Sequence, residues 1–486
     1  MKKPNILWYC TDQQRSDTLG HLGNPHVRTP NIDKLAERGV SFTRAYTQSP
    51  ICTPSRATFL TGRYPATHHV HRNGCDYFPA DEVLVTKLLA DEGYDCGLVG
   101  KLHLSRAKDR VEARPDDGYR FFQWSHHPRP DWAEGHGYAD WLVDEKGVDP
   151  EEVFDSQRQL VYGPGVPAEY HQTTWCTEKS IEFISQNREG PWLLSVNPFD
   201  PHPPFDPPAD YLDRYNPEDL PYPIFGEADI AHQRKFAAID QQTTNASNPY
   251  ANAPSGDAVS GSGDTASEPP SAYDARKVKA CYYAMIEMID HEFGRILDVL
   301  EDTDQLDNTL IIFTSDHGEL LGDHGLLYKG CRFYEGLVHV PLVVSWPAMW
   351  QKNKTADALV ELVDLAPTLL EAAGLEIASG MQGSSLNGIL NGGTNAHKDH
   401  VVCEYYDAVD LPAATHATMY FDGRYKSVVY HGHTLGELYD LQEDPDESND
   451  LWDSDKHFEL RQRLLLKHFD AIMATSGGGV ERTASY

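Results

Sequence analysis

Apolar runs alternate with amphipathic stretches over the first three quarters of the chain. Several of these runs are apolar at consecutive positions, which is typical of strands buried on both faces. We expect strands within residues 5–10, 95–104, 191–199, 308–319 and 340–347. Buried strands separated by helices predict a large, mostly parallel sheet with helices on both sides, and ligands then bind beyond the carboxyl ends of the strands.

The intervening helices are marked by their ends. Residues 29–39 predict a helix that Thr29 caps, with Pro30 in its first turn and Gly39 at its end. A second helix is expected over residues 81–93, and a long amphipathic helix over residues 274–303.

The pattern changes toward the C-terminus. Residues 241–272 are rich in Ser, Ala, Gly, Pro and Asn without an apolar period, which predicts a flexible insertion. After about residue 375, short alternating runs with tight turns predict an antiparallel sheet, and residues 456–475 predict a terminal helix. We therefore expect a catalytic α/β domain over residues 1–375 and a smaller α+β subdomain over residues 376–486.

Composition limits the partners of the chain. Its 486 residues carry a net charge of −33, from 74 acidic and 41 basic residues. Such a surface repels nucleic acid and anionic membranes, so an anionic substrate needs a local cluster of cations. No apolar run reaches the roughly 18 residues of a membrane span. The apolar part of the N-terminus is too short for a signal peptide, so we expect a cytoplasmic location.

The eight cysteines are scattered singly, which argues against a thiolate metal site and favours reduced thiols. Cys52 is the most informative of them, in the stretch SPICTPSRATFLTGRYP. Thr53 as a cap, Pro54 in the first turn and Gly62 at the end predict a short helix. Cys52 then lies at a helix N-terminus, which favours anions, with Arg56 on the same face. The alternative is a buried thiol beside a surface cation, and this helix alone favours neither.

Two pairs of polar residues follow predicted strands. Asp12 and Gln13 come after the first strand, and Asp316 and His317 follow the strand at 308–315. Carboxylate and amide oxygens suit Ca²⁺ or Mg²⁺, and the imidazole extends the choice to Mn²⁺. Alone, Asp12 and Gln13 would favour a turn or a helix cap. Asp316 and His317 could also shape a loop, but two adjacent ligand types after a buried strand favour a site.

Further cations come from three other places. Lys101 and His103 are expected on one face of a strand, since they occupy alternate residues. His202 lies in a Pro-rich loop, and Lys329 follows Asp316 by thirteen residues. Each has an ordinary reading as a solvated cation or a loop histidine.

Together these residues resemble a known family. Cys52-Thr53-Pro54-Ser55-Arg56, followed by Thr61-Gly62-Arg63, is similar to the signature of the type I sulfatases of the alkaline phosphatase superfamily. The other motifs occur in the family's order between residues 5 and 347. The resemblance implies an alkaline phosphatase-like fold and the oxidation of Cys52 to formylglycine (3-oxoalanine) by a formylglycine-generating enzyme.

The resemblance also implies roles for single residues. Asp12, Gln13, Cys52, Asp316 and His317 would hold one divalent metal, with Ca²⁺ the first choice. The catalytic residues would be Cys52, Arg56, Lys101, His103, His202 and Lys329. Of these, Lys101, His202 and Lys329 would also contact the substrate, together with Asn73.

The implied reaction is hydrolysis of a sulfate monoester. We expect a sulfated mono- or oligosaccharide, given the acidic surface and the expected cytoplasmic location. Residues 121–141 are rich in aromatic and His side chains, as either a sugar-binding wall or a packed surface loop would be. A phosphonate monoester hydrolase or phosphodiesterase of the same superfamily is the alternative, although such enzymes generally lack the Lys-x-His pair. A choline sulfatase is a further alternative, and a non-catalytic relative that only binds sulfated sugars a more distant one. The oligomeric state is open.

Overall fold

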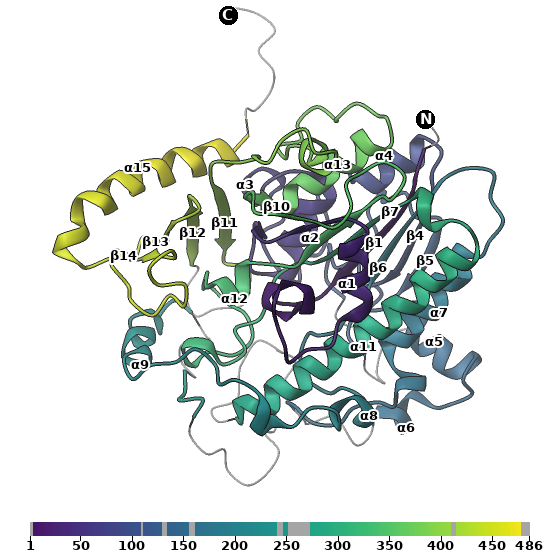
Figure 1. Cartoon of the computed structure of the whole chain (residues 1–486), viewed down its shortest axis with the longest axis horizontal. Coiled ribbons are helices and arrows are strands. Elements are labelled where there is room, and N and C mark those ends of the chain that lie inside the picture. Colours follow the sequence, from purple (N-terminus) through teal and green to yellow (C-terminus); the bar gives the residue numbers. More distant parts are fainter. Residues whose placement is uncertain are drawn as a thin grey trace, which may run out of the picture.

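The computed structural model describes residues 3–107, 110–128, 134–154, 161–240, 246–250, 273–409 and 415–477. Within these residues, an eight-stranded sheet has the order β5-β4-β6-β1-β7-β8-β2-β9. Part of this sheet is labelled in the right half of Figure 1. Its strands are β1 (Asn5–Thr11), β2 (Val40–Phe42), β4 (Asp95–Gly100), β5 (Phe121–Trp124), β6 (Trp192–Asn197), β7 (Thr309–Ser315), β8 (Leu342–Ser345) and β9 (Lys354–Ala356).

Five neighbouring strands, from β5 to β7, run parallel. Strand β8 is antiparallel to both β7 and β2, and β9 runs parallel to β2. The predicted, mostly parallel sheet is therefore confirmed, with one reversed strand.

Alternate residues of β1 face two separate cores, as expected for a strand with period two. Ile6 and Trp8 pack toward one group of helices, while Leu7 and Tyr9 pack toward the other. The first group contains α2 (Cys52–Thr61), α4 (Val85–Asp91) and α13 (Leu365–Ala372). The second contains α1 (Pro30–Glu37), α5 (Gly137–Asp144), α7 (Gln172–Ile184) and α11 (Ala275–Asp302).

Helix α1 is capped differently from the prediction. Thr29 occupies the N-cap position, but its side chain makes no capping bond. Instead, the backbone N–H groups of Asn31 and Ile32 donate to the Asp290 carboxylate of α11, at 2.9 and 2.8 Å. Burial raises the pKa of Asp290 to about 7. The cap therefore comes from a helix some 260 residues away, which also fixes α1 against α11.

A second, four-stranded antiparallel sheet follows the large one, as predicted. It contains β11 (Val401–Tyr406), β12 (His416–Phe421), β13 (Tyr425–His431) and β14 (Leu435–Asp440) in this order. Helix α15 (Phe458–Thr475) packs on it through the His468 ring, which hydrogen bonds to the hydroxyls of Thr418 and Ser427 at 2.8 and 3.0 Å.

The remaining elements are short. Strands β3 (Ala45–Tyr46) and β10 (Val360–Glu361) pair in parallel. The short helices are α3 (Pro65–His68), α6 (Pro150–Phe154), α8 (Ala209–Leu212), α9 (Asp229–Gln233), α12 (Glu335–Val338) and α14 (Asn387–Leu390).

Most of the predicted insertion at 241–272 lies outside the described residues, and the domain boundary near residue 375 remains a prediction. In the described part of the chain, no helix combines the length and apolar character that a membrane crossing requires.

Candidate active site

The candidate residues gather at one edge of the large sheet. Strands β4, β6, β1 and β7 are adjacent and parallel, so their carboxyl ends share this edge. Thr11 and Ser315 pair across β1 and β7, which places the next residues, Asp12 and Asp316, side by side. The site therefore lies where an open α/β sheet is expected to bind ligands.

Four potential metal ligands meet here. The ligand atoms of Asp12, Cys52, Asp316 and His317 all lie within 4.8 Å of one another, and all four residues are buried. His317 Nδ1 faces the carbonyl oxygen of Gly318 at 2.9 Å, so Nδ1 carries the proton. The lone pair of Nε2 is consequently directed into the cluster, 3.1 Å from the Cys52 sulfur.

Gln13 presents its amide oxygen to the same place. Its Nε2 donates to the buried Glu319 carboxylate, which leaves Oε1 to accept from Lys329 Nζ at 2.8 Å. The Gln13 backbone is left-handed (φ 71°) and its carbonyl accepts from the Tyr282 hydroxyl at 2.6 Å. Two carboxylates, one imidazole and one amide oxygen form a donor set that suits a hard divalent cation. These residues therefore fit the implied metal.

Cys52 begins helix α2, as predicted, but Thr53 is not the cap. Ile51 occupies the N-cap position without a side-chain bond. The Thr53 backbone N–H donates instead to the side-chain oxygen of Asn73, at 3.0 Å. Asn73, predicted to contact the substrate, thus uses that oxygen to satisfy the helix start beside Cys52.

Three cations surround the carboxylates. Arg56 Nε donates to Asp316 Oδ2 at 2.9 Å, and Lys101 Nζ contacts Asp12 Oδ2. Lys329 Nζ lies 2.9 Å from the Cys52 sulfur. All of these side chains are almost completely inaccessible to solvent. The site therefore holds the local positive charge that the acidic surface lacks.

These charges shift the titration of the site. Burial alone would raise the pKa of Asp12, but the cations Lys101, Lys329 and Arg56 hold it well below its usual range. Asp12 is therefore ionised at neutral pH and available as a ligand.

Cys52 is affected in the same way. Burial and Asp12 would raise the pKa of the thiol, but the ammonium groups of Lys101 and Lys329 oppose them and the pKa is lowered. Position 52 thus favours a negatively charged or electron-rich group.

The prediction that Lys101 and His103 share one face of a strand is wrong. Strand β4 ends at Gly100, which has a φ of 101°. A Cβ atom there would lie 2.1 Å from the Asn197 carbonyl oxygen, so glycine is required for this turn. Both residues still approach the site, from a loop whose path is set by this glycine and by the left-handed backbone of His103 (φ 57°).

Glu112 holds this loop in place. Its two carboxylate oxygens accept from the backbone N–H groups of His103, Leu104 and Ser105 and from Trp124 Nε1. Glu112 is 3% exposed. Because four donors converge on one buried carboxylate, we regard Glu112 as a positioning residue for the His103 loop.

Aromatic and His side chains line the same region. The His103 ring lies edge-on to His126, with centroids 4.5 Å apart, and Lys101 Nζ lies 5.4 Å from the centre of Phe199. Phe199 also contacts the His202 ring, with centroids 4.4 Å apart. His202 Nδ1 faces the carbonyl of Pro203 at 2.7 Å, so its other ring nitrogen is the acceptor when the ring is neutral.

The sequence interpretation missed three of these residues. Glu319 orients Gln13, Glu112 anchors the His103 loop, and His126 contacts His103. The only feature of the sequence that pointed to any of these three residues was the His-rich stretch around His126. Nothing in the sequence near Glu112 or Glu319 marks the backbone groups that they bind.

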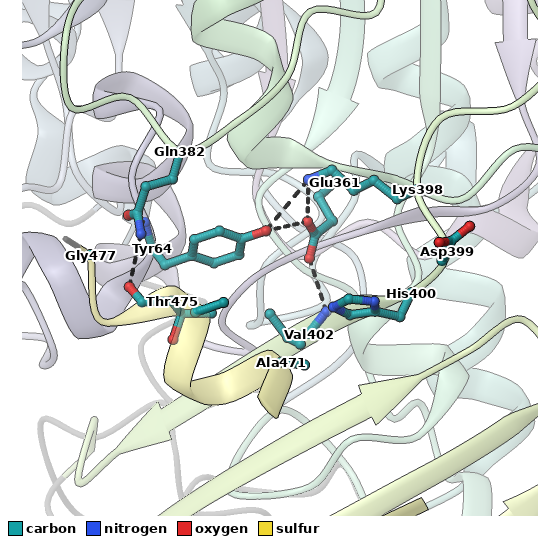
Figure 2. A pocket seen from close by; sticks show the side chains of 11 residues that line it. Tyr64, Glu361, Gln382, Lys398, Asp399, His400, Val402, Ala471, Thr475 and Gly477 are labelled. Carbon is teal, nitrogen blue, oxygen red and sulfur yellow. Dashed lines mark hydrogen bonds and ion pairs between the residues drawn. The ribbon is translucent and has the colours of Figure 1, made fainter. Parts of the chain in front are cut away.

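A separate cavity of about 480 Å³ lies between Tyr64, Glu361, Lys398 and the C-terminal end of α15 (Figure 2). Among its described lining residues are none of those predicted for the site. Three of its polar side chains are bonded within the protein: the Tyr64 hydroxyl donates to Glu361 at 2.5 Å, and Lys398 pairs with Glu361 and with the neighbouring Asp364.

The fold and the site define a hydrolase of the alkaline phosphatase type, with a buried cluster of potential metal ligands at the carboxyl edge of the sheet. A sequence model of the sulfatase family matches residues 4–375, and one described as "N-sulphoglucosamine sulphohydrolase, C-terminal" matches residues 322–472. The chain therefore belongs to the sulfatase family, whose enzymes are sulfuric ester hydrolases.

Individual relatives agree with this assignment. The chain is 28% identical over 485 residues to an arylsulfatase of Clostridium perfringens, covering 96% of this chain and 95% of the relative. It is 25% identical over 516 residues to an N-acetylglucosamine-6-O-sulfatase of Bacteroides thetaiotaomicron, covering 96% and 85%. Among solved structures, a phosphonate monoester hydrolase of Agrobacterium radiobacter has a TM-score of 0.81 and 27% identity, covering 98% of this chain and 96% of that chain.

Proposed function

We propose that this enzyme hydrolyses the sulfate monoester of a mono- or oligosaccharide, with formylglycine derived from Cys52 and a divalent metal. One observation carries the proposal. Cys52 is the first residue of helix α2. Its Sγ atom lies 3.1 Å from His317 Nε2, 2.9 Å from Lys329 Nζ and 3.6 Å from Asp12 Oδ1. Any group formed at position 52 is thereby in reach of the metal ligands and of a cation.

When present, the hydrated aldehyde supplies a hydroxyl nucleophile and the metal supplies positive charge against the sulfate oxygens. Asp12, Gln13, Asp316 and His317 would hold the metal, together with the group at position 52. Ca²⁺ is our first choice, because three of these four side chains offer oxygen. The Asp316 carboxylate also accepts the proton of the attacking hydroxyl, by the resemblance to the family.

The cationic side chains of the site have different roles. Arg56 is fixed to Asp316 and to the Lys101 carbonyl, so its main task is to orient the carboxylate. Lys329 lies beside position 52 and also donates to Gln13, which makes it the ammonium group nearest the ester. These groups are held rigidly before substrate arrives, which is the arrangement that best stabilises charge developing in a transition state.

His103 and His202 handle protons. Burial, Lys101 and Arg56 lower the pKa of His103, and burial and Lys329 lower that of His202, so both rings are neutral at neutral pH. Bound sulfate brings negative charge close to His202, which favours its protonated form and lets it serve the leaving oxygen. His103 assists the release of sulfate from position 52.

A sugar substrate is supported by the wall beside the cations. Phe199, His126 and His127 contact one another there, with ring centroids 5.1–6.4 Å apart. Flat rings next to hydrogen-bonding nitrogens suit a pyranose better than a long polyanion, which the net charge of −33 repels. The relative named N-acetylglucosamine-6-O-sulfatase points in the same direction.

Phosphonate monoester hydrolysis is the second candidate, supported by the similarity to the Agrobacterium radiobacter enzyme. A sulfate monoester offers three terminal oxygens, whereas a phosphonate monoester offers two. Lys101, which contacts Asp12 inside the site, adds a cation that suits the three terminal oxygens of the sulfate monoester. The sulfate ester is therefore our preferred substrate.

The decisive experiment is a comparison of kcat/KM for sulfated monosaccharides, choline sulfate and a phenyl phosphonate monoester. The enzyme is to be co-produced with a formylglycine-generating enzyme, its expected maturation partner. We expect a sulfated sugar to be fastest, and Cys52→Ala to abolish turnover. A faster phosphonate reaction would establish the second candidate. An unmodified thiol in fully active enzyme, detected by mass spectrometry, would refute the proposed nucleophile.

A further inference from the structure

Helix α15 carries an apolar surface on the side that faces away from the protein. Leu464, His468, Ala471 and Thr475 of this helix are buried against the C-terminal sheet. On the opposite side, Leu466 is 70% exposed, Phe469 65% and Met473 57%. At about 100° per residue, these three side chains form one continuous row, which we call the α15 ridge.

The surroundings of the ridge extend the apolar surface on one side only. Phe458, which is 52% exposed, lies on the same side as the half-buried Leu465 and Ile472. The other side carries charges, among them Arg463 and Asp470. The helix lies at the edge of the molecule, with its outer side unobstructed in Figure 1. A row of large exposed apolar side chains with a charged border is typical of an interaction surface.

We propose that the α15 ridge is the contact surface of a homodimer, in which two copies of α15 pack antiparallel about a two-fold axis. In such a pair, each side of a helix meets the same side of its copy. The apolar sides then cover each other, and the charged sides meet.

The charges on the ridge border are complementary in this arrangement. Arg463 and Asp470 are seven residues apart, about two turns, and therefore lie on the same side of α15. When the axis crosses between Leu466 and Lys467, Arg463 of each copy faces Asp470 of the other. Two symmetric ion pairs thus set the register, while parallel packing would offset the two charges.

The size of the surface indicates a reversible dimer. Four apolar side chains exposed by half or more present on the order of 400 Å² per copy, and a standard interface buries roughly 800 Å² per partner. The side chains on either side of the α15 ridge would supply part of the remaining buried area. Because both copies carry a charge of −33, apolar contact must drive the association.

The test is analytical ultracentrifugation of the full chain from about 1 to 100 μM. We expect a monomer–dimer equilibrium in this range, which Phe469→Glu shifts toward the monomer by at least a hundredfold in Kd. The control is Val143→Glu, which introduces the same charge at a half-exposed apolar position of α5 and should leave Kd unchanged. Circular dichroism and turnover of an aryl sulfate check that each variant is folded.

Charge reversal tests the register. Arg463→Asp and Asp470→Arg should each weaken the dimer about tenfold, and the double variant should restore it. A wild-type protein that stays monomeric at 100 μM would overturn the proposal, as would a dimer unaffected by Phe469→Glu. Single reversals that weaken the dimer without rescue in the double variant would overturn the antiparallel register.

Discussion

Replacement of Glu112 by Gln tests whether a buried carboxylate outside the cluster of potential metal ligands controls the position of the His103 loop. One Glu112 oxygen accepts from Leu104 N and Ser105 N, and the other from His103 N and Trp124 Nε1. A Gln side chain has one carbonyl oxygen, so its amide group faces two of these donors whichever way it turns.

The expected loss follows from those two donors. Each buried donor left without a partner costs about 1–3 kcal/mol, so the pair costs roughly 4 kcal/mol. Burial of a neutral amide in place of a carboxylate, whose pKa is raised by that burial, offsets part of the loss. We expect Glu112→Gln to lower the free energy of unfolding by about 2 kcal/mol. The displaced His103 loop should lower kcat/KM at least tenfold, mainly through kcat.

Urea unfolding and aryl sulfate kinetics on the same preparations provide the measurement. Glu37→Gln, on the exposed side of α1, is the matched control and should change neither quantity. If Glu112→Gln unfolds within 0.5 kcal/mol of the wild type and keeps its kcat, the loop does not depend on this carboxylate. A loss of stability with unchanged kcat would assign Glu112 a purely structural role.

Three further predictions concern the metal, the second sheet and pH. Adding Ca²⁺ at a hundred times its Kd should raise the free energy of unfolding by about 2.7 kcal/mol, measured in a thermal-shift titration. Asp316→Asn should abolish this stabilisation. If the variant is stabilised as much as the wild type, the ion binds elsewhere. Glu437→Gln breaks its buried 2.6 Å pair with Arg332 and should cost about 3 kcal/mol in urea unfolding, whereas a change below 1 kcal/mol would mean that Arg332 finds another partner. Burial lowers the pKa of His468 to about 3, so between pH 6.5 and 3 only the unfolded chain binds this proton, and the free energy of unfolding falls by about 1.4 kcal/mol for each unit that the pH is lowered. His468→Gln should remove this contribution from the measured dependence of the unfolding free energy on pH. An unchanged dependence would contradict the lowered pKa of His468.

The sequence was sufficient to predict the positions of the elements that bury long apolar runs. Strands β1 and β7 and helix α11 follow their predicted ranges closely, because length and periodicity agree at each of them. Asp12 and Asp316 lie together as expected, since parallel strands share a carboxyl edge.

The errors arise where a group distant in the sequence decides the local conformation. The apolar alternation of residues 95–104 continues through Gly100, but contact with Asn197 ends the strand there. The cap of α2 is Asn73 rather than Thr53, and the cap of α1 is Asp290 rather than Thr29. Each true cap comes from another element, so a local signal in the sequence could not identify it.

The second sheet has a direct bearing on the chemistry of the first. Lys329 belongs by sequence to the catalytic part, yet the segment that follows it is fixed from the C-terminal sheet. Arg332, 0% exposed, pairs with Glu437 of β14, and Glu335 pairs with Lys426 of β13 at 2.6 Å. Two ion pairs lie within six residues of Lys329, and the Arg332–Glu437 pair is fully buried, so they restrict where the Lys329 ammonium group can lie. The small sheet is therefore part of the apparatus that holds a cation against position 52, and the two sheets act as one unit at the site.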